Sequence, residues 1–203
     1  MRPPASLALG LAVGAAVALF ALAQSPAHAA GPDGVFAVED AGRMPCPAFL
    51  DAKAKKGPAL SRAIGFVEGY VSAANRYEPN TFDLAPWHTP QIYALILEQH
   101  CKKQPTDNLG MAAQRMVAAF QPLRLATPSK LVEVGDGKHK AVLYEAILKR
   151  SQSALARRGL YRGEATGKFD PATEAAFASF QRSASLDPTG VPDPATLWKL
   201  LNP

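Results

Sequence analysis

Cysteine is scarce in this 203-residue chain, which contains two, Cys46 and Cys101. No CxxC pair is present, and the four histidines do not cluster at metal-ligand spacing. Zinc sites and dithiol redox sites need such groupings of cysteine or histidine. The sequence therefore predicts no metal site and no cofactor.

Long apolar runs are lacking after the N-terminus. The run Leu7–Leu22 is about sixteen residues long, shorter than the roughly 20 that a membrane-spanning helix needs. It follows Arg2 and precedes the small residues around Ala29, which is the pattern of a secretory signal peptide. We predict that residues 1–30 are a signal peptide cleaved near Ala29, the alternative being an uncleaved anchor. The mature protein is then periplasmic, without stable membrane insertion and without nucleic acid as a partner.

The predicted export bears on whether the two cysteines are bonded to each other. In an oxidising compartment an isolated pair usually forms a disulfide. We expect a bond between Cys46 and Cys101, the alternative being a redox or metal-binding pair. In the chain-entropy model such a bond stabilises the fold by about 4 kcal/mol.

Catalytic signatures are missing as well. There is no Gly-x-Ser-x-Gly nucleophile motif, and the only conspicuous acid is Glu68, beside the apolar stripe of a predicted helix. Glycosidases need paired carboxylates and zinc amidases need a ligand set. If both cysteines are bonded, no thiol nucleophile remains. We predict that the protein is not an enzyme.

Charge is distributed unevenly along the chain. Residues 33–120 carry nine acidic and nine basic side chains. Residues 138–168 carry eight basic side chains against Glu145 and Glu164. A basic segment on an exported protein suits anionic polymers of the envelope, although such segments are often only a solvated face.

Residues 31–120 are expected to form an all-α domain. Three stripes with helical spacing begin near Leu60, Ile92 and Leu109, and Cys101 lies at the end of the second. The prolines and glycines of residues 121–143 indicate a linker, in which 130–134 can pair with 140–143 as a small hairpin.

A repeated segment is the strongest signal in the chain. Gly167–Thr173 recurs as Gly190–Thr196 with five of seven positions identical. In each copy the glycine suits a turn, the aspartate can cap a helix, and the proline can occupy its first position. Together with a helical pattern that begins at Tyr144 and stops at Gly159, the two copies predict a three-helix bundle over residues 144–203.

These residues resemble the peptidoglycan-binding domain found at the ends of many bacterial cell-wall hydrolases. The resemblance lies in Gln152-Ser153-Ala154-Leu155, Gly159-Leu160-Tyr161, Gly167–Thr173, Phe180-Gln181 and Thr189–Leu197. It implies a module that binds the glycan or the stem peptides of peptidoglycan.

Most residues of that pattern are expected to build the fold, with Leu155, Phe169, Phe177 and Phe180 in the core. The side chains expected to contact ligand are an arginine that can pair with a stem-peptide carboxylate, two aromatic rings that can lie against a sugar face, and one amide. They are Tyr161, Arg162, Gln181 and Trp198.

The earlier half is similar to the HdeA/HdeB periplasmic acid-stress chaperones. The segments Cys46–Leu50, Thr89–Ile92 and Cys101–Pro105 carry this likeness. It implies a small helical domain with one disulfide that binds unfolded or partner periplasmic proteins. Secreted-toxin immunity proteins also carry a Gly-Tyr in the first helix, as in Gly69-Tyr70, and paired cysteines.

The prediction is therefore an exported, non-catalytic envelope protein that binds peptidoglycan through residues 144–203 and presents a helical, chaperone-like domain. The alternatives are a peptidoglycan hydrolase or accessory factor of wall turnover, and an immunity protein.

Overall fold

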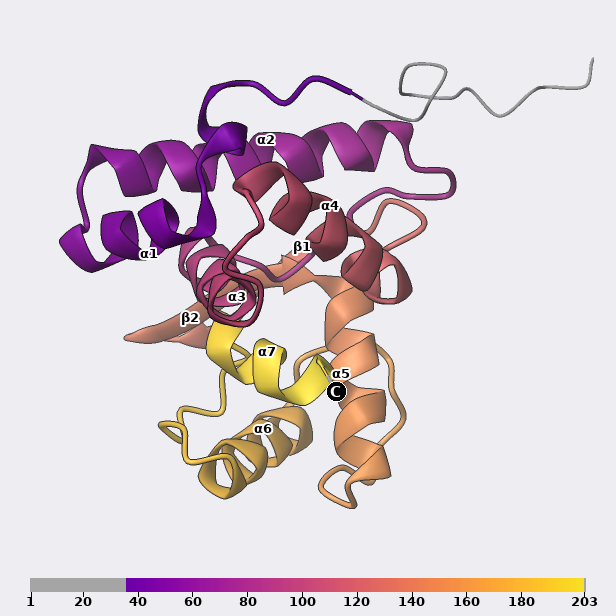
Figure 1. Cartoon of the computed structure of the whole chain (residues 1–203). Coiled ribbons are helices and arrows are strands. Elements are labelled where there is room, and N and C mark those ends of the chain that lie inside the picture. Colours follow the sequence, from indigo (N-terminus) through magenta and orange to yellow (C-terminus); the bar gives the residue numbers. More distant parts are fainter. Residues whose placement is uncertain (1–35, 203) are drawn as a thin grey trace, which may run out of the picture. The chain divides into compact units, whose positions relative to one another are not determined.

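The computed structural model describes residues 36–202, so the predicted signal peptide lies outside the described residues. Residues from Val38 onward form one compact unit. Its first part is helical and contains a 3-10 turn, η1, and four α-helices (Figure 1). Their bounds are η1 Asp40–Arg43, α1 Cys46–Lys55, α2 Pro58–Tyr77, α3 Pro90–Lys103 and α4 Leu109–Phe120. We call residues 40–120 the helical region.

The predicted disulfide is present. Cys46, the first residue of α1, is bonded to Cys101 in the last turn of α3, with Cα atoms 4.9 Å apart. Both cysteines are fully buried, in a core that includes Phe49, Val67 and Leu97. The disulfide therefore fastens α1 to α3 inside the helical region.

Local signals explain where α3 and α4 begin. The Thr89 side chain accepts a hydrogen bond from Ile92 N, and Pro90 occupies the first position of α3. The Asn108 side chain accepts one from Met111 N at the start of α4. Each cap satisfies an amide that the helix itself leaves unpaired. The three expected helices are thus confirmed.

Helix α1 was not predicted. Its buried face consists of Cys46, Phe49 and Ala52, of which only Phe49 is large. So narrow a stripe over ten residues is a weak periodic signal. The disulfide and packing against α2 and α3 hold this helix in place.

Residues 121–143, expected to be a linker, contain ordered structure. After the 3-10 turn η2, Gln121–Leu123, strand β1, Leu131–Asp136, pairs antiparallel with β2, His139–Tyr144. The expected hairpin is therefore confirmed, and the all-α expectation is corrected to a mainly helical chain with one two-stranded sheet in its described part. Val134 is the buried residue of β1 and Leu143 that of β2. Both belong to the core formed with the residues that follow.

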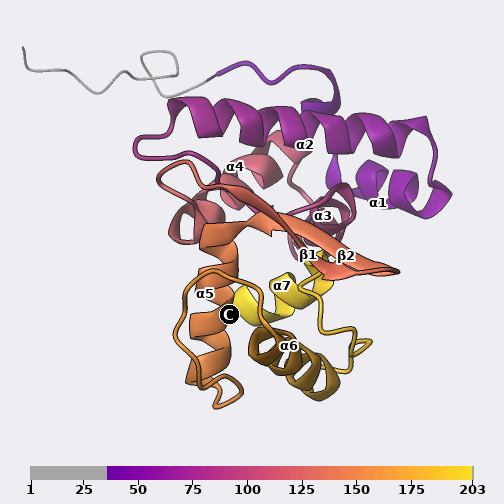
Figure 2. The same cartoon turned by 180° about the vertical axis from the view of Figure 1, so that it is seen from behind.

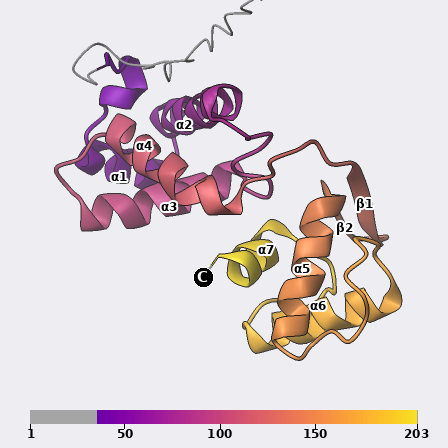
Figure 3. The ribbon, with the colours of Figure 1, turned by 90° about the vertical axis from the view of Figure 1, so that its right-hand side faces the viewer.

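Three helices complete the chain: α5, Glu145–Arg157, α6, Pro171–Ser183, and α7, Pro194–Leu201. The hairpin runs directly into α5 (Figure 2). Figure 3 shows α5, α6 and α7 as a bundle. We call residues 131–201, the hairpin with these helices, the C-terminal domain. Its core includes Ile147, Leu155, Phe177 and Leu197.

The cores of the two regions meet near Trp87. Trp87 and Leu125 are buried together with residues of the C-terminal domain. Arg150 of α5 donates hydrogen bonds to the carbonyls of Leu123 and Arg124, and its guanidinium lies 5.9 Å from the centre of the Trp87 ring. Within residues 36–202, none of the helices combines the length and the apolar character needed to cross a bilayer.

Candidate functional site

The two repeated turns have the same backbone geometry. Gly167 and Gly190 have φ angles of +80° and +75°, a region that glycine adopts without steric cost. A Cβ atom at Gly167 would lie 2.9 Å from Cγ of Glu145, and one at Gly190 would lie 2.7 Å from Cγ of Glu174. Each turn thus packs against a glutamate in the first turn of the preceding helix, and only glycine fits.

A buried glutamine closes the first turn. Gln152 Oε1 accepts a hydrogen bond from Gly167 N at 2.8 Å. Its Nε2 donates to the Lys168 carbonyl and to Thr173 Oγ1, both at 2.9 Å. One amide side chain therefore ties α5 to the turn and to the start of α6.

Gln181 does the same for the second turn. Its Oε1 accepts from Gly190 N at 2.7 Å, and its Nε2 donates to the Val191 carbonyl at 2.8 Å and to Thr196 Oγ1 at 3.0 Å. Gln152 follows Glu145 by seven residues, as Gln181 follows Glu174. We call these two side chains the glutamine clamps.

Aspartate caps start both helices as predicted. Asp170 Oδ1 accepts from Thr173 N, and Asp193 Oδ1 accepts from Thr196 N, each at 2.7 Å. The hydrogen bonds from Thr173 lower the pKa of Asp170, because they favour the charged carboxylate. The repeated residues therefore have a structural role, because they hold the turns and start the helices of the domain.

Two of the four predicted contact residues are buried. Tyr161 is 6% exposed, and its hydroxyl donates to the Glu164 carbonyl at 3.0 Å. Gln181 is fully buried as the second clamp. The structure thus places both inside the domain, where they hold loops.

The other two lie nearer the surface. Trp198 of α7 is half-buried, with its ring 5.7 Å from that of His88 in an edge-on arrangement. Arg162 is exposed in the loop after α5. The structure does not bring these four side chains together as one surface. Contact of the four with peptidoglycan stays a prediction, and Arg162 is the member that is open to solvent.

The expected core residues are largely where the pattern places them. Leu155 and Phe177 are fully buried, and Phe180 is 6% exposed. Phe169 is half-buried instead. Its ring lies at a small cavity of the domain.

That cavity joins the hairpin to the two repeated turns, and we call it the turn cleft. It has a volume of about 240 Å³ and is lined by Gly135, Asp136, His139, Phe169, Glu174, Thr189 and Val191. Asp136 and Glu174 offer exposed carboxylates, His139 an exposed imidazole and Phe169 part of an aromatic face. Such groups can accept hydrogen bonds from sugar hydroxyls or amines and lie against a sugar ring. Sequence reasoning assigned no role to Asp136 or His139, which line a cavity with the repeated turns only in the folded domain.

The basic segment 138–168 separates into structural and free cations. Arg150 and Arg158 donate to backbone carbonyls, and Lys140 pairs with Glu133. The remaining five are exposed and form no salt bridge among the residues that the structure describes: Lys138, Lys149, Arg157, Arg162 and Lys168. They remain available to carboxylates of an anionic polymer.

His88 is a feature that sequence reasoning missed. Both of its ring nitrogens are buried without a hydrogen-bond partner in the described part of the chain. The ring is surrounded by aromatic side chains from both regions, including Phe120 at 4.3 Å and Trp198 at 5.7 Å. Burial lowers the pKa of His88 to about 4, because the charged imidazolium would lose its hydration.

Metal-ligand geometry is not found in the described residues. Within 36–202 there is no group of three or more His, Cys, Asp or Glu side chains placed to hold an ion. Both cysteines are in the disulfide.

A known protein family matches the part of the chain that contains the two repeated turns. Residues 145–200 match the model of the family described as "Putative peptidoglycan binding domain". The match spans α5, both turns, α6 and nearly all of α7. The chain therefore contains a domain of this kind, and the predicted resemblance of the C-terminal residues is confirmed. Neither curated proteins nor solved structures show a significant match to the chain. The likeness of residues 31–120 to the HdeA/HdeB chaperones stays a prediction from the sequence.

Proposed function

We propose that this is an exported, non-catalytic protein of the bacterial envelope that binds peptidoglycan through its C-terminal domain. The observation that carries the proposal is the match of residues 145–200 to a peptidoglycan-binding family. The repeated turns within the matched residues are fully formed, since both glutamine clamps and both aspartate caps make their hydrogen bonds.

The chemistry of the domain surface supports this ligand. Peptidoglycan offers sugar hydroxyls and stem-peptide carboxylates. The five exposed cations can pair with the carboxylates, and the turn cleft can receive hydroxyl or amine groups. Arg162, the exposed member of the predicted contact set, is among these cations.

Binding and hydrolysis are separated by one experiment with purified sacculi. The mature chain, residues 31–203, is expected to sediment with sacculi in a saturable manner and to release no soluble muropeptides. Release of fragments would instead support the alternative, a hydrolase or accessory factor of wall turnover. Failure to sediment would remove the binding proposal.

The turn cleft can be tested within the same assay. The double variant Asp136→Asn, His139→Ala changes two exposed side chains of the cleft and is expected to bind sacculi about tenfold more weakly. Val142→Ala, which trims a side chain that is 64% exposed on β2 outside the cleft, is the matched control. Equal binding by both variants would place the ligand elsewhere on the domain.

The helical region is proposed to act on other proteins of the periplasm while the C-terminal domain holds it at the wall. This proposal rests on the sequence likeness to acid-stress chaperones, which implies one disulfide such as the bond between α1 and α3. A chaperone of this type suppresses aggregation of client proteins after a shift to about pH 2–3, where many proteins expose apolar surface. Absence of such suppression would remove the chaperone role and leave wall binding intact.

A further inference from the structure

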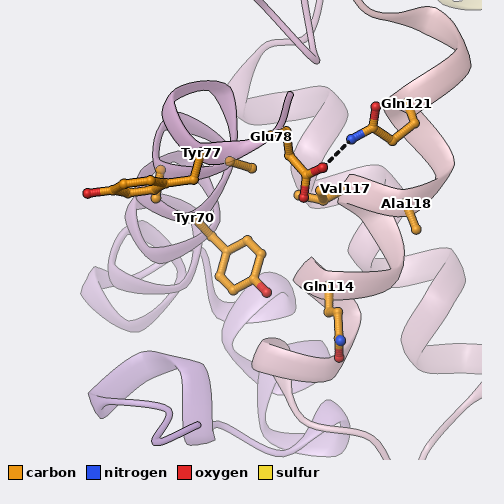
Figure 4. A pocket seen from close by; sticks show the side chains of 9 residues that line it. Tyr70, Tyr77, Glu78, Gln114, Val117, Ala118 and Gln121 are labelled. Carbon is orange, nitrogen blue, oxygen red and sulfur yellow. Dashed lines mark hydrogen bonds between the residues drawn. The ribbon is translucent and has the colours of Figure 1, made fainter. Parts of the chain in front are cut away.

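A second groove lies in the helical region, between the end of α2 and the face of α4 (Figure 4). Its volume is about 440 Å³, within the range of small-molecule sites. We call it the α2–α4 groove. The residues that matter here are Tyr70, Tyr77, Glu78, Gln114, Val117 and Gln121.

The groove has a pre-arranged polar pair. Gln121 Nε2 donates a hydrogen bond to Glu78 Oε2 at 2.8 Å, which orients both planar groups. Glu78 Oε1 and Gln121 Oε1 form no hydrogen bond with the described residues, and neither does the amide of Gln114. Planar carboxylate and carboxamide groups can make paired hydrogen bonds, and neighbouring sugar hydroxyls present donors and acceptors at matching spacing.

Two tyrosines of α2, Tyr70 and Tyr77, line the groove beside the Glu78–Gln121 pair. Tyr77 is 73% exposed, and Arg76 stacks on its ring at 5.5 Å from the centre. Tyr70 is half-buried, and burial together with the charge of Glu78 raises the pKa of its hydroxyl. Tyr70 therefore stays a neutral donor, while the exposed ring of Tyr77 offers an apolar face with a polar tip. An exposed aromatic ring at the mouth of a polar groove is suited to the C–H face of a sugar.

The remaining lining limits the class of ligand. Among the residues that line the groove, Glu78 is the one acidic side chain, and no lysine, arginine or histidine is included, so the lining disfavours an anionic ligand. Ala74, Val117 and Ala118 form an apolar part of the lining, which fits a methyl group. A purely apolar ligand would bury Glu78 and the amides without partners, which is unfavourable.

We propose that the α2–α4 groove binds an uncharged oligosaccharide of N-acetylhexosamines. One sugar ring lies on Tyr77, its hydroxyls bond to Glu78 and Gln121, and an acetamido methyl lies against Val117. The groove is outside residues 145–200, so this inference goes beyond the peptidoglycan-binding domain and does not depend on it.

To test this proposal, the mature chain is titrated with a tetramer of β-1,4-linked N-acetylglucosamine, and binding is measured by calorimetry. Tyr77→Ala removes an exposed ring and Glu78→Gln removes the carboxylate; each is expected to weaken binding about tenfold. Leu131→Ala removes an apolar side chain that is 56% exposed on β1, away from the groove, and is expected to bind as the wild type does. Thermal unfolding of every variant checks that the fold is intact.

A second arm identifies the source of the sugar. Glycan strands of peptidoglycan freed of stem peptides are titrated in parallel. Binding of the strands alone, lost in Tyr77→Ala, assigns the groove to wall glycan. Binding of the tetramer alone, with the same loss, assigns it to a glycan outside the wall.

The proposal is overturned if neither glycan binds, or if binding is unchanged in both groove variants. That second result would place the sugar outside the groove and leave the proposed wall binding standing. Conversely, loss of sacculus binding in turn-cleft variants would leave the groove result unaffected.

Discussion

The helical region and the C-terminal domain both hold several helices together, and they do so by different means. In the helical region a disulfide joins α1 to α3 across 55 residues of sequence. The C-terminal domain contains no cysteine. There, two buried glutamines each accept a glycine amide and donate to a carbonyl and a threonine hydroxyl.

The difference helps to explain why the C-terminal domain matches a family model. A disulfide needs two cysteines at a suitable distance and places few demands on the residues between them. A glutamine clamp needs the glutamine, a left-handed glycine, an aspartate cap and a threonine at fixed spacing. The clamp therefore leaves a readable signature, and it does so twice.

Removing the disulfide is expected to have the largest effect on stability. Closing a loop of this length contributes about 4 kcal/mol in the chain-entropy model. The double variant Cys46→Ala, Cys101→Ala should lose stability of that order in urea unfolding followed by circular dichroism. Amide exchange should show the loss in α1 to α3 and continued protection in α5 to α7. A loss below about 1 kcal/mol would mean that packing alone holds the helical region.

Acid is expected to have the next largest effect, through His88. Its folded-state pKa of about 4 lies below the unfolded value of 6.5, so the unfolded chain binds the proton more readily. This contribution to stability is complete above pH 6.5 and is lost as the pH falls toward 4, by about 3 kcal/mol.

The variant His88→Phe isolates this effect. It keeps an aromatic ring between Trp87 and Phe120 and removes the titrating group, so the decline between pH 6.5 and 4 should be smaller by that amount. His139→Ala, at an exposed histidine, is the control. An unchanged pH dependence in His88→Phe would contradict the assignment.

Breaking either glutamine clamp should cost somewhat less. Gln152→Ala or Gln181→Ala leaves a buried glycine amide and a carbonyl without their partners, a loss of about 2 kcal/mol. The two losses should be similar because the bonds are equivalent. Gln99→Ala, at an exposed position of α3, should change urea unfolding little. A much smaller loss for Gln181 would indicate that its turn is held by other contacts.

The smallest effect concerns the turn glycines. Gly190 and Gly159 both have positive φ angles, +75° and +73°. A Cβ at Gly190 would meet Glu174, whereas one at Gly159 would meet nothing within 4 Å. Gly190→Ala should therefore be less stable than Gly159→Ala by about 1 kcal/mol, the cost of overpacking. Equal melting temperatures would show that Glu174 moves aside freely.

Local chemistry was the part of this structure that the sequence could predict. Asp170 and Asp193 act within three residues of themselves, so the caps were visible as motifs. Gln181 was predicted to contact ligand, but it is buried as a clamp. That role could not be predicted, because it depends on Gly190 and Thr196, which the fold brings to it. Helix α1 was missed because a disulfide and neighbouring helices, rather than its own pattern, hold it. The setting of His88 arises only where two cores meet.

The central claim is that the C-terminal domain itself carries the affinity for the wall. The most direct measurement uses residues 121–203, which retain the hairpin, Leu125 of the C-terminal core and the Leu123 and Arg124 carbonyls that accept hydrogen bonds from Arg150. This fragment should fold, as judged by circular dichroism, and sediment with purified sacculi in a saturable manner. A folded fragment that stays in the supernatant at every concentration of sacculi would contradict the account.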